Sequence, residues 1–398
     1  MYNMKVVKSS NYDRIVECIY RNPSISRKEI SDLTGITTAT VTTTVSAMFA
    51  DGIVKELGQV EEDKGTIGRA RIALDIVADY GFTIGVEFSF TALSTCATDM
   101  HGSLLYFHSL PYSQDLGEHI TQLIIDNIQA CMDSLKLPQE KLLGIGIGVP
   151  GHMDHNCQYM VSTNDDWCHF DGSKIREAFT CPVVLENNIR CMAISQYLHN
   201  PQQTPANFAL FHIGQGMFCA NVTDEGLYIG NTYGSGEIGH TVAVLDGRRC
   251  KCGKRGCLET VATEGAILND AIQIFNCNPN SLLHNFADCA EVLTIEHVVA
   301  AYAAGDPYIC RLLTQALRYI CIATLNIAIL MNPEKLFLHG RLFNNPDIRS
   351  DLMEMVRKEF DFTGNNYRLG SVDSLPCQAE DGAKGASAFA IWKCVLHA

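Results

Sequence analysis

The stretch "HTVAVLDGRRCKCGKRGCLE", residues 240–259, is the most informative part of the chain, because it brings one histidine and three cysteines together within twenty residues. The four side chains belong to His240, Cys250, Cys252 and Cys257. Three thiolates and one imidazole are the number and kind of ligands that close a tetrahedral Zn²⁺ site and leave no open position for catalysis. The sequence therefore predicts one structural zinc ion.

The residues around these ligands fit the same interpretation. Gly253 and Gly256 would let the loop fold tightly around an ion. Four basic side chains in the stretch would offset the charge of three thiolates: Arg248, Arg249, Lys251 and Lys254. The other interpretation, a reactive or merely buried cysteine cluster without a metal, stays open at this point.

Length and charge limit the class of protein. With 398 residues and 47% hydrophobic content, the chain is long enough for two or three hydrophobic cores. A net charge of −14 argues against a protein that coats nucleic acid or an anionic membrane. The charge is uneven, because residues 1–80 hold ten Lys/Arg against eleven Asp/Glu. A near-neutral head on an acidic body can still dock on DNA through one local surface.

The sequence favours a cytoplasmic protein that does not enter a membrane. The N-terminal residues lack the basic and apolar pattern of a secretory signal. The most apolar run, "ICIATLNIAILM" at residues 320–331, is too short to cross a bilayer and is expected to be a buried helix. Most of the 17 cysteines stand singly in apolar runs, which fits reduced thiols better than a disulfide framework.

The first 50 residues have the pattern of a helix-turn-helix. "NYDRIVECIYRN", residues 11–22, places Ile15 and Ile19 at helical spacing and ends at a proline. "SISRKEISDLTG", residues 24–35, offers Ser26 with Glu29 as a capping box and closes on Gly35. "ITTATVTTTVSAMFADG", residues 36–52, completes the unit with an inward apolar face of Val41, Val45 and Met48.

The outward face of this third helix is rich in threonine. Six threonines lie between residues 37 and 44, although threonine is a mediocre helix former. Short side chains with methyl and hydroxyl groups suit a recognition helix in the major groove. The alternative is an ordinary solvated helix face. The predicted DNA contacts of the whole head are Ser26, Arg27, Thr37, Thr38, Thr40, Thr42, Thr43, Arg69 and Arg71.

A two-stranded wing follows the three helices. Residues 52–77 alternate apolar and polar side chains on both sides of a loop that contains Gly65 and Gly68. Arg69 and Arg71 would then reach a phosphate or a minor groove. They are equally consistent with a basic linker.

From Gly81 onward the pattern changes to α/β. Short β-type runs such as "FTIGVEFSF" and "LLGIGIGVPG" alternate with helical stretches, and a second set begins at "NFALFHIGQGMFCANVTDEGLYIG". Two similar strand-rich halves with helices between them predict two lobes around a ligand-binding cleft.

The order of three motifs resembles the ROK family of sugar kinases and sugar-responsive transcription regulators. The motifs are "SGEIGH" at 235–240, "CKCGKRGCLE" at 250–259 and "LNIAILMNPEKLFLHG" at 325–340. With a winged helix in front, the chain is similar to the regulator branch. The resemblance implies an actin-like, ribonuclease H-like sugar-kinase-type body: lobe I at residues 81–200, with a C-terminal helix at 381–398 returning to it, and lobe II at 201–380 with the zinc loop. The winged helix-turn-helix would occupy residues 1–80.

The resemblance also implies a sugar pocket. Its residues would be Asn164, Asn187, Asn188, Glu237, His240 and Glu259. Carboxylates and amides suit a sugar, because each hydroxyl group both donates and accepts hydrogen bonds. Without the resemblance, a role as turn or cap residues would be the favoured interpretation of each asparagine.

Four kinase elements of the family depart from its pattern. The D-x-G-G-T-type phosphate loop is "EFSFT" at 87–91, the second phosphate segment is "GQGMFCA" at 214–220, and "LHG" at 338–340 replaces a glycine pair. Asn188 stands where the family has the Asp that acts as general base, and an amide cannot accept that proton. The bulky Phe88, Phe90, Met217 and Phe218 are expected to crowd the phosphate space.

The sequence thus predicts a sugar-responsive transcription regulator, a repressor of carbohydrate-utilisation genes, that is not an enzyme. Its partners would be operator DNA and a sugar or sugar phosphate, and it would act as a homodimer or homotetramer. Two rival interpretations stay open: an ATP-dependent sugar kinase with a regulatory DNA-binding head, and a DNA-binding regulator that responds to a protein partner.

Overall fold

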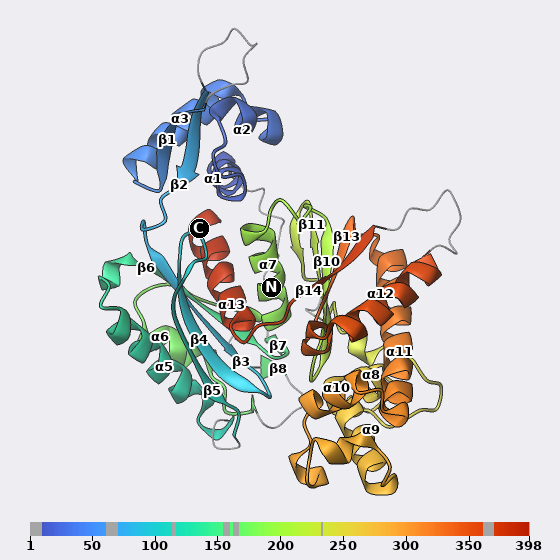
Figure 1. The fold of residues 1–398 in the computed structure, drawn as a ribbon. Helices are drawn as coiled ribbons and strands as arrows, with labels where there is room; N and C mark the ends of the chain where they lie inside the picture. Colours follow the sequence, from blue (N-terminus) through green and yellow to red (C-terminus); the bar gives the residue numbers. More distant parts are fainter. Residues whose placement is uncertain are drawn as a thin grey trace. The chain divides into compact units, whose positions relative to one another are not determined.

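The computed structural model describes residues 10–60, 71–113, 117–153, 160–161, 167–231, 234–360 and 370–397. The chain divides into two compact units (Figure 1). Unit 1 comprises Met1–Thr204 and Ala379–Ala398, and unit 2 comprises Pro205–Gln378. The division predicted from the sequence, with a separate domain at 1–80, stays a prediction.

The head of unit 1 is a winged helix-turn-helix. It consists of α1 (Asn11–Arg21), α2 (Arg27–Thr34), α3 (Thr38–Ala50) and the antiparallel strands β1 (Val54–Val60) and β2 (Arg71–Ile76). Ser26 and Glu29 form the predicted capping box of α2, and Gly35 ends that helix in a left-handed conformation. The inward face of α3 is buried as predicted, at Val41, Val45 and Met48.

Lobe I is built on a five-stranded sheet in the order β5-β4-β3-β6-β9. The strands are β3 (Phe82–Phe88), β4 (Ala92–Asp99), β5 (Leu104–Pro111), β6 (Leu142–Val149) and β9 (Val183–Asn187). A short η1 (Gln139–Lys141) precedes β6, and β7 (His152–Met153) pairs with β8 (Met160–Val161).

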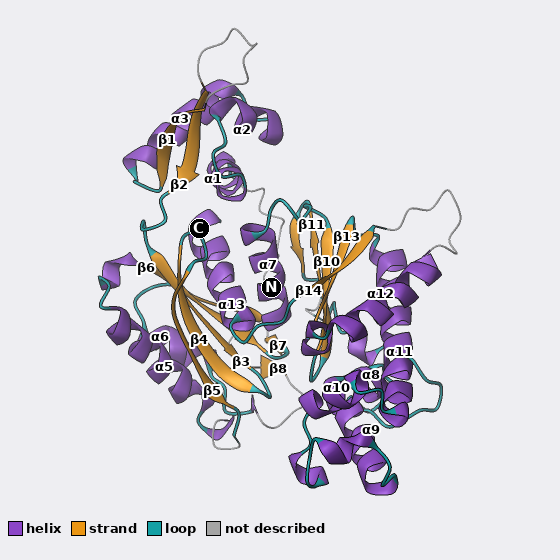
Figure 2. Cartoon of the chain, in the orientation of Figure 1, coloured by secondary structure: helices purple, strands orange, loops and turns teal. Residues whose placement is uncertain are grey.

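Helices cover both faces of this sheet, as Figure 2 shows in purple. One face carries α5 (Ile120–Leu135) and α6 (Gly172–Ala178), and the other carries α7 (Asn188–His199) and α13 (Asp381–Ile391). The last described turn, η8 (Trp392–Leu396), continues α13. Figure 1 shows α13, in red, side by side with α7, in green, so the C-terminal segment packs on lobe I.

Lobe II repeats the same sheet plan in the order β12-β11-β10-β13-β14. Its strands are β10 (Phe208–Ile213), β11 (Met217–Thr223), β12 (Gly226–Tyr228), β13 (Lys335–His339) and β14 (Ser371–Leu375). Its helices are η3 (Ile238–His240), α8 (Glu259–Ala262), α9 (Glu264–Cys277), η4 (Leu282–Asn285), η5 (Ala290–Val292), α10 (Ile295–Ala303), α11 (Pro307–Met331), η6 (Arg341–Asn344) and α12 (Pro346–Phe360).

Both sheets share one topology. In each, the first three strands in sequence form an antiparallel meander, and the fourth and fifth pair in parallel beside the first. Strand order 3-2-1-4-5 in two consecutive lobes is the ribonuclease H-like arrangement that the sequence predicts. The fold class is therefore confirmed.

The apolar run at 320–331 belongs to a longer helix than the run itself suggests. The helix α11 has 25 residues, and by length and composition alone it is apolar enough to cross a membrane. Half of its most apolar window is buried, however, and Leu313, Leu317, Ile320 and Ile327 lie in the hydrophobic core of unit 2. Its role in this structure is that of a core helix.

Candidate functional site

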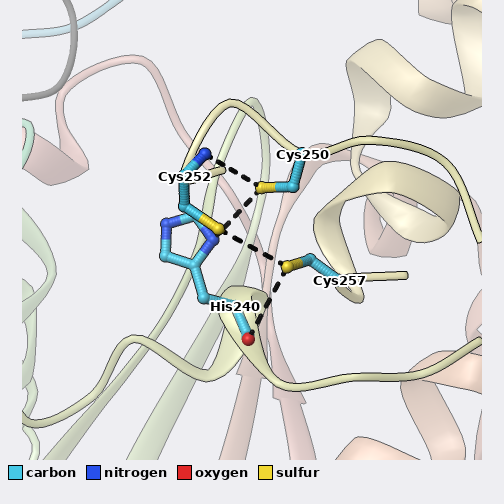
Figure 3. Close-up of side chains that lie close together, drawn as sticks. All are labelled: His240, Cys250, Cys252 and Cys257. Carbon is cyan, nitrogen blue, oxygen red and sulfur yellow. Dashed lines mark hydrogen bonds between the residues drawn. The ribbon is translucent and has the colours of Figure 1, made fainter. Parts of the chain in front are cut away.

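The four predicted metal ligands lie together in lobe II. His240 ends η3, and the three cysteines lie in the loop between η3 and α8 (Figure 3). One ligand atom from each of His240, Cys250, Cys252 and Cys257 lies within 4.8 Å of all the others. Figure 3 shows the sulfurs and the imidazole ring turned toward a common centre. The cluster has the donor set and the closeness to hold a metal ion.

Two distances define the shape of the cluster. The sulfurs of Cys252 and Cys257 are 3.6 Å apart, and the Cys250 sulfur lies 3.6 Å from Nδ1 of His240. Cys250 and Cys257 are buried, whereas His240 and Cys252 are half-buried. The side chains therefore form a closed group with one edge near the surface.

The loop reaches this shape through a close backbone approach at Gly256. Its φ is +75°, and a Cβ atom there would lie 1.7 Å from the carbonyl oxygen of Val244. Gly256 N–H donates to the Arg248 carbonyl oxygen across 2.9 Å, and Cys250 N–H donates to the Lys254 carbonyl oxygen across 2.8 Å. These contacts fold the loop back on itself, so that Cys250 and Cys257 face each other.

Two carboxylates flank the histidine of the cluster. Glu237 Oε2 lies 3.9 Å from His240 Nε2, and Glu259 Oε1 lies 3.5 Å from His240 Nδ1. Glu259 also lies 2.9 Å from the Cys250 sulfur. The structure therefore brings together three of the predicted sugar-binding residues, Glu237, His240 and Glu259, directly beside the cysteine cluster.

The other predicted sugar-binding residues belong to unit 1. Asn187 and Asn188 lie at the junction where β9 passes directly into α7. Asn187 is 4% exposed and caps α7, because its side-chain oxygen accepts from the N–H groups of Ile189 and Arg190. Its amide donates to the Gly151 carbonyl oxygen across 3.1 Å. Asn164 lies outside the described residues.

Asn188 makes a contact that sequence reasoning missed. Its side-chain amide donates to Oε1 of Glu87 across 3.0 Å. Glu87 stands in the segment "EFSFT", so two of the four departures from the kinase pattern touch each other. Burial raises the pKa of Glu87 to about 7, and the hydrogen bond from Asn188 opposes that rise. A carboxylate in place of Asn188 would face Glu87 directly and repel it.

The bulky residues of the two phosphate segments pack largely inside the protein. Phe88 is fully buried and packs against Trp167 and Phe170, with ring centroids 4.9 Å and 5.1 Å away. Phe90 packs at 5.4 Å from Trp167. Met217 and Phe218 are 3% and 6% exposed on β11. Phe88, Met217 and Phe218 are thus buried, and Phe90 is half-buried just after the end of β3. That these four side chains crowd a phosphate stays a prediction.

The segment "LHG" carries a further pair that the sequence did not reveal. His339 and His212 come from the paired strands β13 and β10, and their Nδ1 atoms lie 2.8 Å apart. Burial and the neighbouring His339 lower the pKa of His212 to about 3, so its ring is neutral. Next to them, Arg341 forms an ion pair with Glu264, a carboxylate that is only 2% exposed. No sequence motif joins His212 and Glu264 to His339 and Arg341, from which they are far apart in the chain.

The predicted recognition helix exposes its threonines. Thr38, Thr42 and Thr43 are exposed on α3, and Thr37 caps the helix by accepting from the Thr40 N–H group. The hydroxyl groups of Thr42 and Thr43 donate to carbonyl oxygens of Thr38 and Ala39, one turn earlier. Each hydroxyl oxygen keeps acceptor capacity, and both side chains are exposed, which suits contact with base edges.

The predicted basic contacts are held by acidic residues of the same head. Arg27 pairs with Glu56 at 3.1 Å, and Arg71 pairs with Glu29 at 3.4 Å. Ser26 is 5% exposed and already serves as a helix cap, so a DNA contact there would share its hydroxyl group. Arg69 lies outside the described residues. Contact with DNA stays a prediction for all of these residues.

Comparison with known proteins identifies two family models within the chain. Residues 83–393 match the ROK family, and residues 13–55 match a winged helix-turn-helix DNA-binding model. The first match covers both lobes, and the second covers α1, α2 and α3.

Similar proteins include regulators and kinases. The xylose repressor of Bacillus spizizenii is 26% identical over 369 residues, 91% of this chain and 91% of its own. A solved ROK family transcriptional regulator, a homolog of the Escherichia coli MLC protein, has a TM-score of 0.73 at 21% identity and covers 97% of both chains. A ROK family glucokinase from Streptomyces griseus, in complex with glucose and AMPPNP, has a TM-score of 0.65 at 24% identity and covers 78% of this chain and 99% of its own.

Proposed function

The chain belongs to the ROK family, and from this premise we propose that it is a sugar-responsive, DNA-binding transcription regulator without kinase activity. The observation that carries the proposal is the pairing of a winged helix with a complete ROK body. The xylose repressor aligns with 91% of this chain. The glucokinase structure covers 99% of its own length but only 78% of this chain. This chain has in addition the winged helix-turn-helix head, which is suited to binding DNA.

We propose further that the cysteine cluster holds one structural Zn²⁺ ion. In a tetrahedral site with Zn–S of about 2.3 Å and Zn–N of about 2.0 Å, ligand atoms lie roughly 3.6–3.8 Å apart. Both defining distances of the cluster are 3.6 Å. Four protein ligands would leave no open position, so the ion would brace the loop. His240 Nδ1 would face the ion, and Glu237, 3.9 Å from Nε2, would orient the imidazole ring.

The absence of kinase activity rests on the Asn188–Glu87 contact. An amide at 188 cannot remove a proton from a sugar hydroxyl group. Glu87 is only 9% exposed and one of its oxygens accepts from the Asn188 amide at 3.0 Å, so we propose that it does not take over the role of the missing base. The bulk of Phe88 and Met217 contributes nothing to this proposal, since both side chains point into hydrophobic cores.

The regulatory cycle follows from these parts. Sugar would bind beside Glu237, His240 and Glu259 and shift the population between two states with different affinity for operator DNA. Asn187 and Asn188 stay predicted sugar contacts. A cytoplasmic homodimer or homotetramer would present two winged helices to two half-sites. Every described cysteine is free, which suits a reducing compartment.

Thermal unfolding of the full-length protein against single ligands tests the proposal. The ligands are D-xylose, D-glucose, N-acetyl-D-glucosamine, their phosphates, and Mg-ATP. A ligand at a hundred times its dissociation constant stabilises by about 2.7 kcal/mol, a shift of a few degrees. A shift with one sugar and none with Mg-ATP is expected. A shift with Mg-ATP together with ATP turnover would establish the kinase alternative, and no shift with any sugar would favour a protein partner.

Substitution of Glu237 distinguishes the sugar response from DNA binding. Glu237→Ala is expected to abolish the sugar shift and leave DNA binding intact. Glu225→Ala, an exposed glutamate in the hairpin between β11 and β12, is the matched control and is expected to keep the full shift. A Glu237→Ala protein that still responds to sugar would show that Glu237 is not part of the sugar pocket.

A further inference from the structure

The helix α7 starts at the predicted sugar-binding asparagines. Asn187 caps it, and Asn188 is its first residue. The Asn188 amide binds Glu87 at 3.0 Å, which ties the first turn to the end of β3. Below this turn, the buried ion pair between Arg190 and Glu186 joins α7 to β9 at 3.2 Å. A change at Asn188 therefore acts on a turn that is fixed to the sheet at several points.

The other end of α7 contacts the winged helix. The Tyr197 hydroxyl group donates to Oε1 of Glu17 across 2.7 Å, and the Tyr20 hydroxyl group lies 3.1 Å from Nε2 of His199. Glu17 and Tyr20 belong to α1, the first helix of the head. Burial lowers the pKa of His199 to about 4, so a neutral imidazole pairs with the Tyr20 hydroxyl group. Tyr197 and His199 lie nine and eleven positions after Asn188, about 14 and 17 Å along the helix axis.

Arg21 strengthens the same contact. Its guanidinium lies 3.7 Å above the centre of the Tyr197 ring and donates to the carbonyl oxygens of Tyr197 and Thr204 across 3.2 Å and 3.1 Å. The C-terminal segment joins in, because His397 lies 2.9 Å from the second oxygen of Glu17. We call this set of residues the α1 latch: Glu17, Tyr20, Arg21, Tyr197, His199 and His397.

The middle of α7 is packed too closely to bend. A Cβ atom on Gly385 of α13 would lie 2.8 Å from the backbone nitrogen of Met192, so the two helix backbones nearly touch. One turn earlier, a Cβ atom on Gly382 would lie 2.6 Å from Cγ of Glu87. The backbone of α13 thus rests on Glu87 and on α7 together. Interiors packed this closely shift as rigid pieces rather than deform.

We propose that α7 is the lever that couples the Glu87–Asn188 pair to the winged helix, by carrying displacements of its first turn to α1 through the α1 latch. This inference rests on the proposed function, because it takes the Asn188 end of α7 as part of the sugar site. The inference adds the path by which sugar binding would affect the winged helix. Sugar that changes the Asn188 contact would alter the placement of α1 without touching the head.

A second route between the two parts exists and defines the competing outcome. The wing continues from β2 into β3, Met100 N–H donates to the Ala78 carbonyl oxygen across 3.1 Å, and His101 Nε2 lies 3.2 Å from the Ile76 carbonyl oxygen. These contacts attach the wing to lobe I. The α1 latch holds the first helix, so the two routes are separated by removing the latch alone.

A double-mutant cycle followed by hydrogen exchange tests the lever without sugar or DNA. Asn188→Asp places a carboxylate against Glu87 and stands for a disturbance of the sugar end. Tyr197→Phe with Glu17→Gln removes the hydrogen bond and the charge at the centre of the latch. In the full-length protein, Asn188→Asp is expected to speed amide exchange in α1 by about threefold or more. In the latch variant, Asn188→Asp is expected to leave α1 exchange unchanged while still speeding exchange in the first turn of α7.

Control variants keep the cycle interpretable. Tyr308→Phe with Glu225→Gln removes the same groups from exposed positions in lobe II and is expected to preserve the full effect of Asn188→Asp on α1. Asn188→Ala, which deletes the bond to Glu87 without a new charge, serves if Asn188→Asp fails to fold. Equal effects on α1 with and without the latch would overturn the lever and favour the wing route. An effect confined to α7 would overturn it too. Because neither sugar nor DNA is used, such a failure is distinct from failure of the proposed function.

Discussion

Asn188 and Glu87 are joined by a hydrogen bond of 3.0 Å, although 101 positions separate them in the chain. The bond links the end of β3 to the first turn of α7. It pairs a neutral amide with a buried carboxyl group, where an aspartate at 188 would pair two carboxyl groups. Two of the segments that depart from the kinase pattern therefore touch each other in the folded chain.

This arrangement predicts a stability change with pH. The folded-state pKa of Glu87 is about 7, well above its usual value, because burial disfavours the charged form. A carboxyl group with a raised folded-state pKa destabilises the fold increasingly as pH rises from the unfolded pKa of about 4.3 to the folded one. Glu87→Gln removes this group and is expected to gain stability relative to wild type between pH 5 and 8, by up to about 3 kcal/mol.

Denaturant unfolding of both proteins at pH 5 and pH 8 measures this difference. Glu118→Gln, an exposed glutamate of lobe I, is the control and is expected to show the same pH dependence as wild type. A Glu87→Gln protein whose stability relative to wild type is the same at both pH values would show that Glu87 ionises normally in the fold.

The local features of the fold could be read from the sequence, because neighbouring residues produce them. The cap of α2 needs only Ser26, Glu29 and the chain between them, and its left-handed end needs only Gly35. The metal cluster likewise depends on ligands within a single loop, so their spacing predicts their closeness. The repeated sheet plan followed from two strand-rich halves of similar pattern.

The site contacts that sequence reasoning missed depend on tertiary packing. The Asn188–Glu87 contact joins α7 to β3 and the His212–His339 contact joins β10 to β13, and no spacing rule links the partners. The face on which Phe88 lies, by contrast, follows from the sequence, because Phe82, Ile84, Val86 and Phe88 alternate with Thr83, Gly85 and Glu87 and join one hydrophobic core. The contacts of Phe88 with Trp167 and Phe170 depend on tertiary packing and could not be predicted.

The cysteine cluster predicts a defined metal content. Protein purified without chelators is expected to hold one zinc ion per chain, as measured by atomic emission. Cys252→Ser removes a half-buried ligand and is expected to lose the metal and lower Tm by more than about 5 °C, because metal binding supplies folding free energy. Cys277→Ser changes an exposed cysteine outside the cluster and should keep both metal and Tm. Full zinc content in Cys252→Ser would contradict the assignment of the ligands.

The arginine contacts predict how DNA binding depends on salt. Arg27 pairs with Glu56 at 3.1 Å on the exposed surface of the head. A DNA phosphate would take the place of Glu56. Arg27→Ala is expected to weaken binding of a duplex selected from a random library and to reduce the slope of log affinity against log salt by about 1.

Two further variants test this interpretation by titration at several salt concentrations. Glu56→Gln releases Arg27 and is expected to tighten DNA binding. Arg311→Ala, an exposed arginine of α11 in lobe II, should leave both affinity and slope unchanged. An unaltered slope in Arg27→Ala would place the phosphate contacts elsewhere on the head.

Two glycines of the metal loop are predicted to differ in their sensitivity to the same substitution. Both have positive φ, +91° at Gly253 and +75° at Gly256, so alanine strains the backbone at either position. At Gly253 a Cβ atom meets nothing within 4 Å, and the strain alone is expected to cost about 1 kcal/mol. At Gly256 the Cβ atom would lie 1.7 Å from the Val244 carbonyl oxygen. Because backbone occupies that space, Gly256→Ala must open the loop, at a cost of about 3 kcal/mol or more.

Denaturant unfolding and zinc competition measure both effects. Gly256→Ala should lose stability and zinc affinity together, and Gly253→Ala should keep its zinc affinity. Equal losses in the two variants would mean that backbone strain, rather than the contact with Val244, governs the loop.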